Sequence, residues 1–155
     1  MAFLQEKDTI SGKQAKAFAT INGRVEELFY AKSIEAKITK KKTDVPVLGK
    51  TNVGKRTVGW DGSGTLTVYY TTSLFRKLML DYIKTGKDFS FDLQIINDDP
   101  QSGAGKQTAV LKGCNLDEVI AAKFDASGDG MLEEEMPFTF SDYDLLNQFS
   151  PLSGQ

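Results

Sequence analysis

Residues 73–95 have the sequence SLFRKLMLDYIKTGKDFSFDLQI, in which helical periodicity changes to strand periodicity within a few positions. In the first half, apolar side chains recur at helical spacing and form one stripe, at Leu74, Phe75, Leu78, Met79, Tyr82 and Ile83. In the second half they alternate with polar residues, at Phe89, Phe91, Leu93 and Ile95. The pattern predicts an amphipathic helix that packs on a sheet and is followed directly by a half-buried strand.

The ends of this helix also carry recognisable signals. Ser73 can cap the first turn by accepting a backbone N–H, and Lys84 suits the negative end of the helix dipole. Gly86 can adopt the left-handed conformation that ends a helix. We therefore expect about three helical turns between Ser73 and Gly86, with a packing role rather than a cofactor role.

Outward from this stretch, period-two alternation dominates the chain. Asn22-Gly23 fits a type I′ hairpin turn between strands at 16–21 and 24–29, and a Gly-rich turn is expected at 61–64. Further strands are expected at 34–39, 65–70, 108–114, 115–124 and 136–140. The pattern predicts a mainly β (α+β) fold, a β-sandwich or barrel with one flanking α-helix.

Composition limits the possible functions. The 155 residues suit a single domain spanning 1–155, and 19 basic against 21 acidic residues give a formal charge of −2. Such a charge provides no general attraction to nucleic acid or anionic membranes. The first residues lack the features of a signal peptide, and no apolar run is long enough to span a membrane. Production in the cytosol is expected because the chain has a single Cys and so no internal disulfide.

Two residue types are almost absent. The chain has no His, which excludes every mechanism that uses an imidazole base or ligand, and Cys114 is the single Cys, which excludes an internal disulfide. Asp98 and Asp99 are adjacent in a loop, but no catalytic partner for them is evident. We expect no enzyme activity.

Two stretches differ from the strand pattern. Residues 40–58 are basic, contain glycine and show little periodicity, so they predict a long loop between strands, of the kind that is usually functional or disordered. The C-terminal arm, about 142–155, has apolar side chains that need burial, for which a neighbouring copy is one candidate, at Tyr143, Leu145, Leu146, Phe149 and Leu152.

Two motifs match known sites only in part. Residues 49–55 have P-loop spacing, but Arg56 stands where the motif needs Ser or Thr, and no helix follows. Asp125, Ser127 and Asp129 match the first half of an EF-hand loop, but the bidentate Glu of that motif is replaced by Met136. We expect no nucleotide, metal or cofactor, and we expect the acidic run at 133–135 to form a solvated or repelling face.

The basic cluster has three possible interpretations. Its members are Lys37, Lys40, Lys41, Lys42, Lys50, Lys55 and Arg56. They could contact phosphate, they could form a solvated loop, or they could meet the acidic stretch 125–135 of another copy. The residues alone leave these alternatives open.

Taken together and in order, several segments between about residues 9 and 144 resemble the tail tube (inner tube, or core) proteins of contractile phage tails. The likeness is greatest to those of PBSX-like defective prophages and related phage-tail-like bacteriocins. It is carried by Thr9-Ile10-Ser11-Gly12-Lys13, Gly62-Ser63-Gly64-Thr65, Met79, Asp81-Tyr82, Lys84, Gly86, Asp88, Phe91, Leu93-Gln94, Asp98-Asp99, Leu132-Glu133-Glu134-Glu135 and Pro137-Phe138-Thr139-Phe140.

This resemblance implies a structural virion protein without an active site. Six copies would form a ring, and rings would stack into a rigid tube inside a contractile sheath, with baseplate and tape-measure proteins as further partners. The particle would be assembled in the bacterial cytoplasm, and the tube would be driven through the target envelope. DNA would pass through the lumen without specific binding in a phage; phage, prophage remnant and bacteriocin all remain possible.

The same resemblance implies that the 40–58 loop and the terminal arms contact a neighbouring ring. The expected interface consists of Val45, Val47 and Leu48 as apolar anchors, with Lys50, Lys55, Arg56, Phe149 and Leu152. The alternative function is a soluble β-barrel binding module for carbohydrate or single-stranded nucleic acid. Against a nucleic-acid module, Phe89 and Phe91 lie among Ser90, Asp92 and Gln94 without interleaved basic residues.

Overall fold

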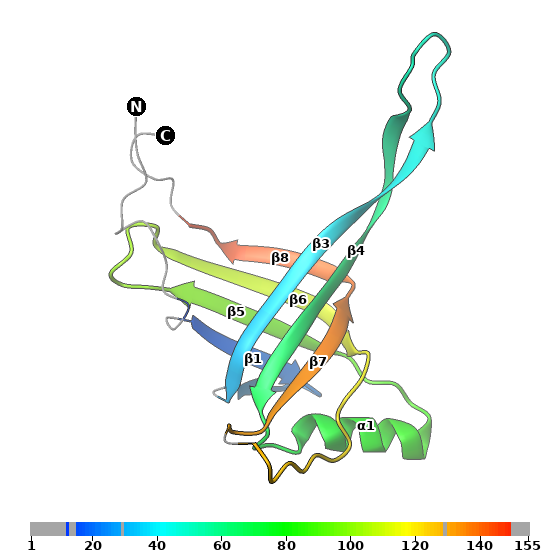
Figure 1. Cartoon of the computed structure of the whole chain (residues 1–155). Coiled ribbons are helices and arrows are strands. Elements are labelled where there is room, and N and C mark those ends of the chain that lie inside the picture. Colours follow the sequence, from blue (N-terminus) through cyan, green and yellow to red (C-terminus); the bar gives the residue numbers. More distant parts are fainter. Residues whose placement is uncertain (1–11, 13–14, 29, 129, 150–155) are drawn as a thin grey trace.

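The computed structural model describes residues 12, 15–28, 30–128 and 130–149 (Figure 1). In chain order the elements are β1 (Ala15–Ile21), β2 (Arg24–Glu27), β3 (Ala31–Val45), β4 (Gly54–Tyr69), α1 (Leu74–Thr85), β5 (Phe91–Asp98), β6 (Lys106–Leu116), β7 (Glu133–Phe140) and β8 (Asp142–Asn147). Within these residues no helix has the length and apolarity needed to cross a membrane.

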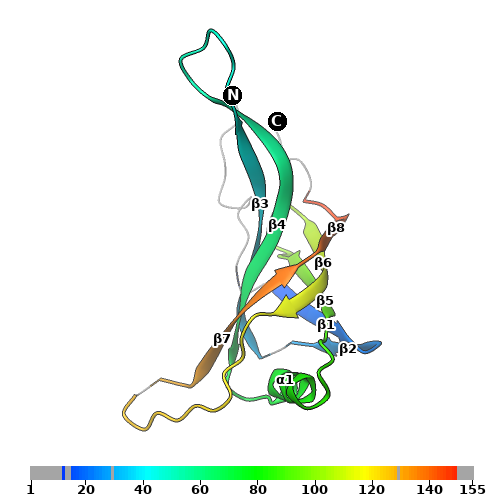
Figure 2. The same ribbon diagram turned by 90° about the vertical axis from the view of Figure 1, so that its right-hand side faces the viewer.

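The strands form one antiparallel sheet that folds over itself at β6. The order is β2-β1-β5-β6-β7-β4-β3, and β8 also pairs with β6. The first part of β6 pairs with β5 and β8, whereas its last two residues, Asn115 and Leu116, pair with β7. Two layers of strands therefore cross each other, and α1 lies at one end of them (Figure 2). The predicted β-sandwich or barrel with a flanking helix is confirmed.

The core lies between the two layers and follows the predicted alternation. Ala17, Ala19 and Ile21 of β1 are buried, as are Phe91 and Leu93 of β5. The remaining strands contribute Leu66, Val68, Leu111, Cys114, Leu116, Met136, Phe138 and Phe140. Apolar burial of this kind supplies most of the stability of such a domain.

Helix α1 closes one end of this core. Phe75 is buried, and its ring centroid lies 6.1 Å from that of Phe91. Gly86 ends the helix at φ 74°, as predicted. Ser73 occupies the N-cap position, but its side chain makes no capping bond; the Thr72 hydroxyl accepts from the Leu74 N–H at 3.2 Å instead.

The predicted turn at 61–64 is wrong, because these residues belong to strand β4. Gly62 pairs with Phe140 and Gly64 pairs with Phe138. A Cβ on Gly62 would lie 2.5 Å from the Phe140 ring, and a Cβ on Gly64 would lie 2.5 Å from the Glu35 carbonyl oxygen. The glycines leave room for two aromatic rings over the strand, which is the usual meaning of glycine inside a sheet.

The predicted strand at 115–124 is also wrong. Strand β6 ends at Leu116, and residues 117–128 and 130–132 form no regular element. The Asp117 N–H donates to the Pro137 carbonyl at 2.8 Å, but Pro137 has no N–H to return, so the β6–β7 ladder stops there. Strand β7 in turn begins at Glu133 rather than at Met136.

Cys114 provides a test of the packing of the core. Its side chain is buried, and burial raises the pKa of its thiol to about 12. Because the thiolate is the reactive form, we expect a thiol reagent at neutral pH to modify Cys114 only at the rate of unfolding. Labelling monitored by mass spectrometry, with and without urea, measures this rate; rapid labelling of the native protein would contradict the packing described.

Candidate assembly interface

The longest element of the molecule is a β-hairpin that projects beyond the sandwich (Figures 1 and 2). Strands β3 and β4 pair from Ala31–Val68 to Val45–Gly54, with only residues 46–53 forming the tip. The predicted loop at 40–58 is therefore mostly a paired ribbon. Its strands show no alternation because both of their faces are exposed, so nothing selects apolar residues for one face.

The projecting part of the hairpin is exposed on both faces from residue 37 to residue 53. It nevertheless carries large apolar side chains, namely Ile38, Val45, Val47, Leu48, Val53, Val58 and Trp60. A two-stranded ribbon of this kind is only marginally stable in water, and a large exposed apolar surface is typical of an interaction site. The hairpin thus has the properties of a surface that is covered in an assembly.

One face of the hairpin continues the core-facing side of the sandwich. Ile34 pairs with the buried Leu66, and the same face then reaches Ile38 and the Lys40–Trp60 pair. The Trp60 ring centroid lies 6.2 Å from that of Phe140 at the margin of the core. An apolar stripe therefore continues from the body of the molecule along the hairpin, where its side chains are exposed.

The hairpin is also strongly basic. Residues 37–56 include seven basic residues and one acidic residue, Asp44. Salt bridges join Lys55 to Asp44 at 2.5 Å and Lys41 to Asp61 at 3.2 Å. Within the described residues the other exposed cations of the ribbon make no salt bridge, and they are Lys37, Lys40, Lys42, Lys50 and Arg56.

The sheet has open edges that could pair with another chain. Strand β3, with 15 residues, is the last in the strand order and has one unpaired edge, and the four-residue β2 lies at the other end. A long exposed edge strand is a template for strand addition from another molecule. Together with the exposed hairpin, this open edge gives the chain two surfaces that another molecule can cover.

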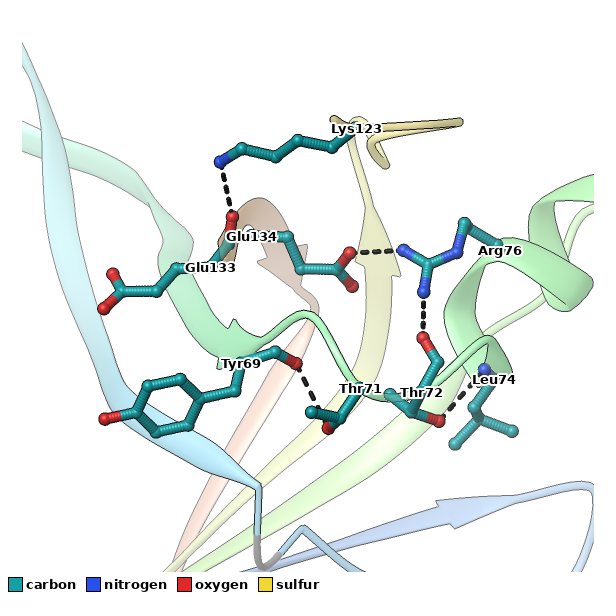
Figure 3. A network of polar contacts seen from close by, with 8 residues as sticks. All are labelled: Tyr69, Thr71, Thr72, Leu74, Arg76, Lys123, Glu133 and Glu134. Atoms are coloured by element: carbon teal, nitrogen blue, oxygen red, sulfur yellow. Dashed lines mark hydrogen bonds and ion pairs between the residues drawn. The ribbon is translucent and has the colours of Figure 1, made fainter. Parts of the chain in front are cut away.

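A buried charge cluster holds α1 against the sheet (Figure 3). Glu134 is only 1% exposed, and its Oε2 accepts a hydrogen bond from Arg76 Nη1. Arg76 also donates through Nη2 to the Thr72 carbonyl oxygen, and its guanidinium lies 4.3 Å from the centroid of the Tyr70 ring. In the part of the chain that the structure describes, Glu134 Oε1 has no hydrogen-bond partner.

The prediction that the 133–135 run is solvated is wrong at its central residue. Glu134 alternates with Glu133 and Glu135 along β7, on the same side as the buried Met136 and Phe138. The sequence already contains this two-residue alternation, which places the Glu134 side chain on the core-facing side of β7. Glu133 is partly exposed, and Lys32 Nζ lies 2.6 Å from its Oε1; this bond raises the pKa of Lys32.

The expected interface residues lie on two separate parts of the structure. Val45, Val47, Leu48, Lys50, Lys55 and Arg56 are all exposed on the hairpin. Phe149 is half-buried just after β8, and Leu152 lies outside the described residues. Strand β8 itself turns the first part of the predicted C-terminal arm into a paired strand beside β6.

The two partial motifs also have definite positions. Residues 49–55 form the hairpin tip and the start of β4, and no helix follows them. Asp125 Oδ1 accepts from the Ser127 N–H at 3.0 Å and from its hydroxyl at 2.7 Å, bonds that lower the pKa of Asp125. This closes a local turn; Asp129 lies outside the described residues. The absence of a metal or cofactor remains a prediction.

Solved structures with this arrangement include chains of contractile injection systems. The chain superimposes with a TM-score of 0.69 on a chain of the anti-feeding prophage tube-terminating cap, covering 96% of this chain and 97% of that chain at 11% identity. For an extracellular contractile injection system sheath–tube complex the TM-score is 0.63, covering 90% and 93% at 14% identity. At these identities the likeness establishes the fold: that of tail tube proteins.

Sequence comparison identifies the family. Residues 2–147 match the model of the phage tail tube protein family, and the chain belongs to this family. It is 40% identical over 147 residues to the phage-like element PBSX protein XkdM of Bacillus subtilis strain 168, covering 95% of this chain and 97% of that protein. The protein is therefore a structural tail tube protein and not an enzyme, as the sequence predicted.

Proposed function

We propose that this chain forms hexameric rings that stack into the inner tube of a contractile phage tail or phage-tail-like particle. The observation that carries the proposal is the β3–β4 hairpin, which projects from the body with both faces exposed and carries large exposed apolar side chains. A head-to-tail contact that closes by rotation gives a ring, and a second contact along the axis gives an open stack. The open edges of the sheet suit the first contact and the hairpin suits the second.

The partners follow from this position in the particle. A sheath would surround the tube, a baseplate and a tape-measure protein would start it and set its length, and contraction would drive it through the target envelope. The chain would be assembled in the cytoplasm of the host and would end in the virion or particle. One structural neighbour belongs to a sheath–tube complex in the extended state, and this supports the arrangement. The proposal holds for a lumen that carries DNA and for one that does not.

Negative-stain electron microscopy of the concentrated protein, beside its sizing profile, tests the proposal. We expect rings with a central hole and six-fold symmetry, and tubes built from them. A protein that stays monomeric at every concentration and binds a carbohydrate or a single-stranded nucleic acid instead would overturn the proposal in favour of a binding module.

A shortened hairpin distinguishes the contact within a ring from the contact between stacked rings. We expect replacement of Val45–Gly54 by Asn-Gly, which can close a two-residue turn between the paired Asp44 and Lys55, to leave rings intact and to abolish their stacking. The reason is that the deletion removes the apolar tip but leaves the β3 edge beside the body of the sheet. Tube length in micrographs is the readout, with circular dichroism to verify the fold; unchanged tubes would contradict the axial role of the tip.

A further inference from the structure

We infer that the basic hairpin of one copy docks on the acidic segment, residues 117–131, of a copy in the adjacent ring. This inference rests on the proposed function and names the surface that receives the hairpin. Figures 1 and 2 place the hairpin tip and the acidic segment at opposite ends of the molecule. Copies that stack in one direction therefore bring the tip of one copy to the acidic end of the next.

The charges of the two surfaces are complementary. The hairpin, residues 37–56, has seven basic residues and one acidic residue, whereas the acidic segment has four acidic residues and one basic residue, Lys123. Asp117, Glu118 and Asp125 are on the part of the segment that the structure describes. The one cation of the segment already has a hydrogen-bond partner in its own chain, because Lys123 Nζ donates to the Glu133 carbonyl oxygen at 2.7 Å. Complementary charges of this kind fix partner and register.

Both surfaces also expose apolar side chains. Leu48 is fully exposed at the hairpin tip, and in the acidic segment Phe124 is 90% and Met131 is 81% exposed. Aromatic and Met side chains are enriched at the centre of protein interfaces, where the partner molecule buries them. Phosphate or nucleic acid would account for the cations of the hairpin but not for its apolar tip or for the acidic segment. A second copy of this chain accounts for all three.

The acidic segment is suited to receive a partner because few backbone contacts hold it to the body. It forms no regular element in its described residues, and its bonds to the body include the Lys123 bond and the Asp117–Pro137 backbone bond at its start. Such a segment can adjust to an incoming ribbon at low cost.

A charge swap tests the pairing. One variant carries Lys40→Glu, Lys42→Glu, Lys50→Glu and Arg56→Glu; the other carries Asp117→Lys, Glu118→Lys and Asp125→Lys. We expect each alone to form rings but to reduce tube mass on the order of tenfold or more, because like charges then face each other. We expect the combined variant to recover tubes, because its charges are again opposite.

Cross-linking measures the contact directly. Leu48→Cys protein is mixed with Phe124→Cys protein, assembled and oxidised, and disulfide-linked dimers are expected only in the tube fraction. The matched control pairs Leu48→Cys with Val25→Cys, an exposed site on β2, and is expected to give none. The buried Cys114 is retained in all variants.

The outcomes separate the two proposals. Suppose that wild-type protein forms tubes, that Leu48→Cys and Phe124→Cys proteins assemble without cross-linking, and that the combined charge variant fails to recover stacking. These results would overturn this inference and leave the proposed function standing. Wild-type protein that forms neither rings nor tubes would overturn the proposed function, and this inference with it. Cross-linking together with recovery by the combined variant would establish the pairing.

Discussion

Replacement of Arg76 by Met is expected to lower the free energy of unfolding by about 3–5 kcal/mol, because it leaves a buried carboxylate without its partner. Glu134 is 1% exposed, and the Arg76 guanidinium is the only cation that the described residues bring to it. Its Oε1 already has no hydrogen-bond partner among these residues. Urea denaturation, at a concentration that keeps each variant monomeric, measures the change.

Two further variants isolate the cause. Arg76→Met combined with Glu134→Leu removes both charges and is expected to recover most of the loss, since apolar replacement of a buried ion pair is often neutral or stabilising. Lys77→Met changes the next, exposed residue of α1 and should remain within about 0.5 kcal/mol of the parent. If Arg76→Met cost no more than Lys77→Met, the buried pair would not hold the helix on the sheet.

The sequence predicted the elements in which one periodicity and one set of end signals agree. Helix α1 and strand β5 follow from the apolar spacing in 74–95, and the Gly86 end has the φ that its residue type indicated. The Asn22-Gly23 turn joins β1 to β2 with positive φ at both positions, as its dipeptide predicts. These features depend on interactions between residues that are close in the sequence, so the local sequence predicts them.

The hairpin could not be predicted in the same way. Beyond the predicted strand at 34–39 its strands are exposed on both faces in the single chain, so the alternation that marks a half-buried strand is absent between residues 40 and 53. The sequence nevertheless singled out this stretch, because its basic and apolar composition has no explanation in a domain core. Which surface receives it depends on the arrangement of the whole fold.

Two other errors arose from residues whose role is set by a distant partner. Gly62 and Gly64 have the composition of a turn, and only the rings of Phe140 and Phe138, far along the chain in β7, show why β4 needs them. Glu134 lies in a run with the composition of a solvated face, and only Arg76, 58 residues earlier, shows how its charge is compensated inside the fold. Long-range pairing therefore overrode local preference at both positions.

Gly64→Val is expected to destabilise the fold by about 3 kcal/mol or more, although valine is a better strand former than glycine. A Cβ at this position would lie 2.5 Å from the Glu35 carbonyl oxygen and 2.6 Å from the Phe138 ring. Phe138 is 1% exposed in the core, so its ring has no free space to enter, and the Glu35 carbonyl belongs to the paired β3 backbone. The strain would therefore be relieved only by separating β3 or β7 from β4.

Gly59→Val is the matched control, because Gly59 lies in the same strand and a Cβ there would meet nothing within 4 Å. We expect this variant to unfold at a urea concentration equal to or above that of the parent, since valine stiffens the unfolded chain and suits a strand. Adding Phe138→Leu to Gly64→Val should not recover stability, because the Glu35 carbonyl would still obstruct the new side chain. Equal midpoints for Gly64→Val and Gly59→Val would show instead that the aromatic rings do not lie over β4, and the crossing of the two layers would have to be reconsidered.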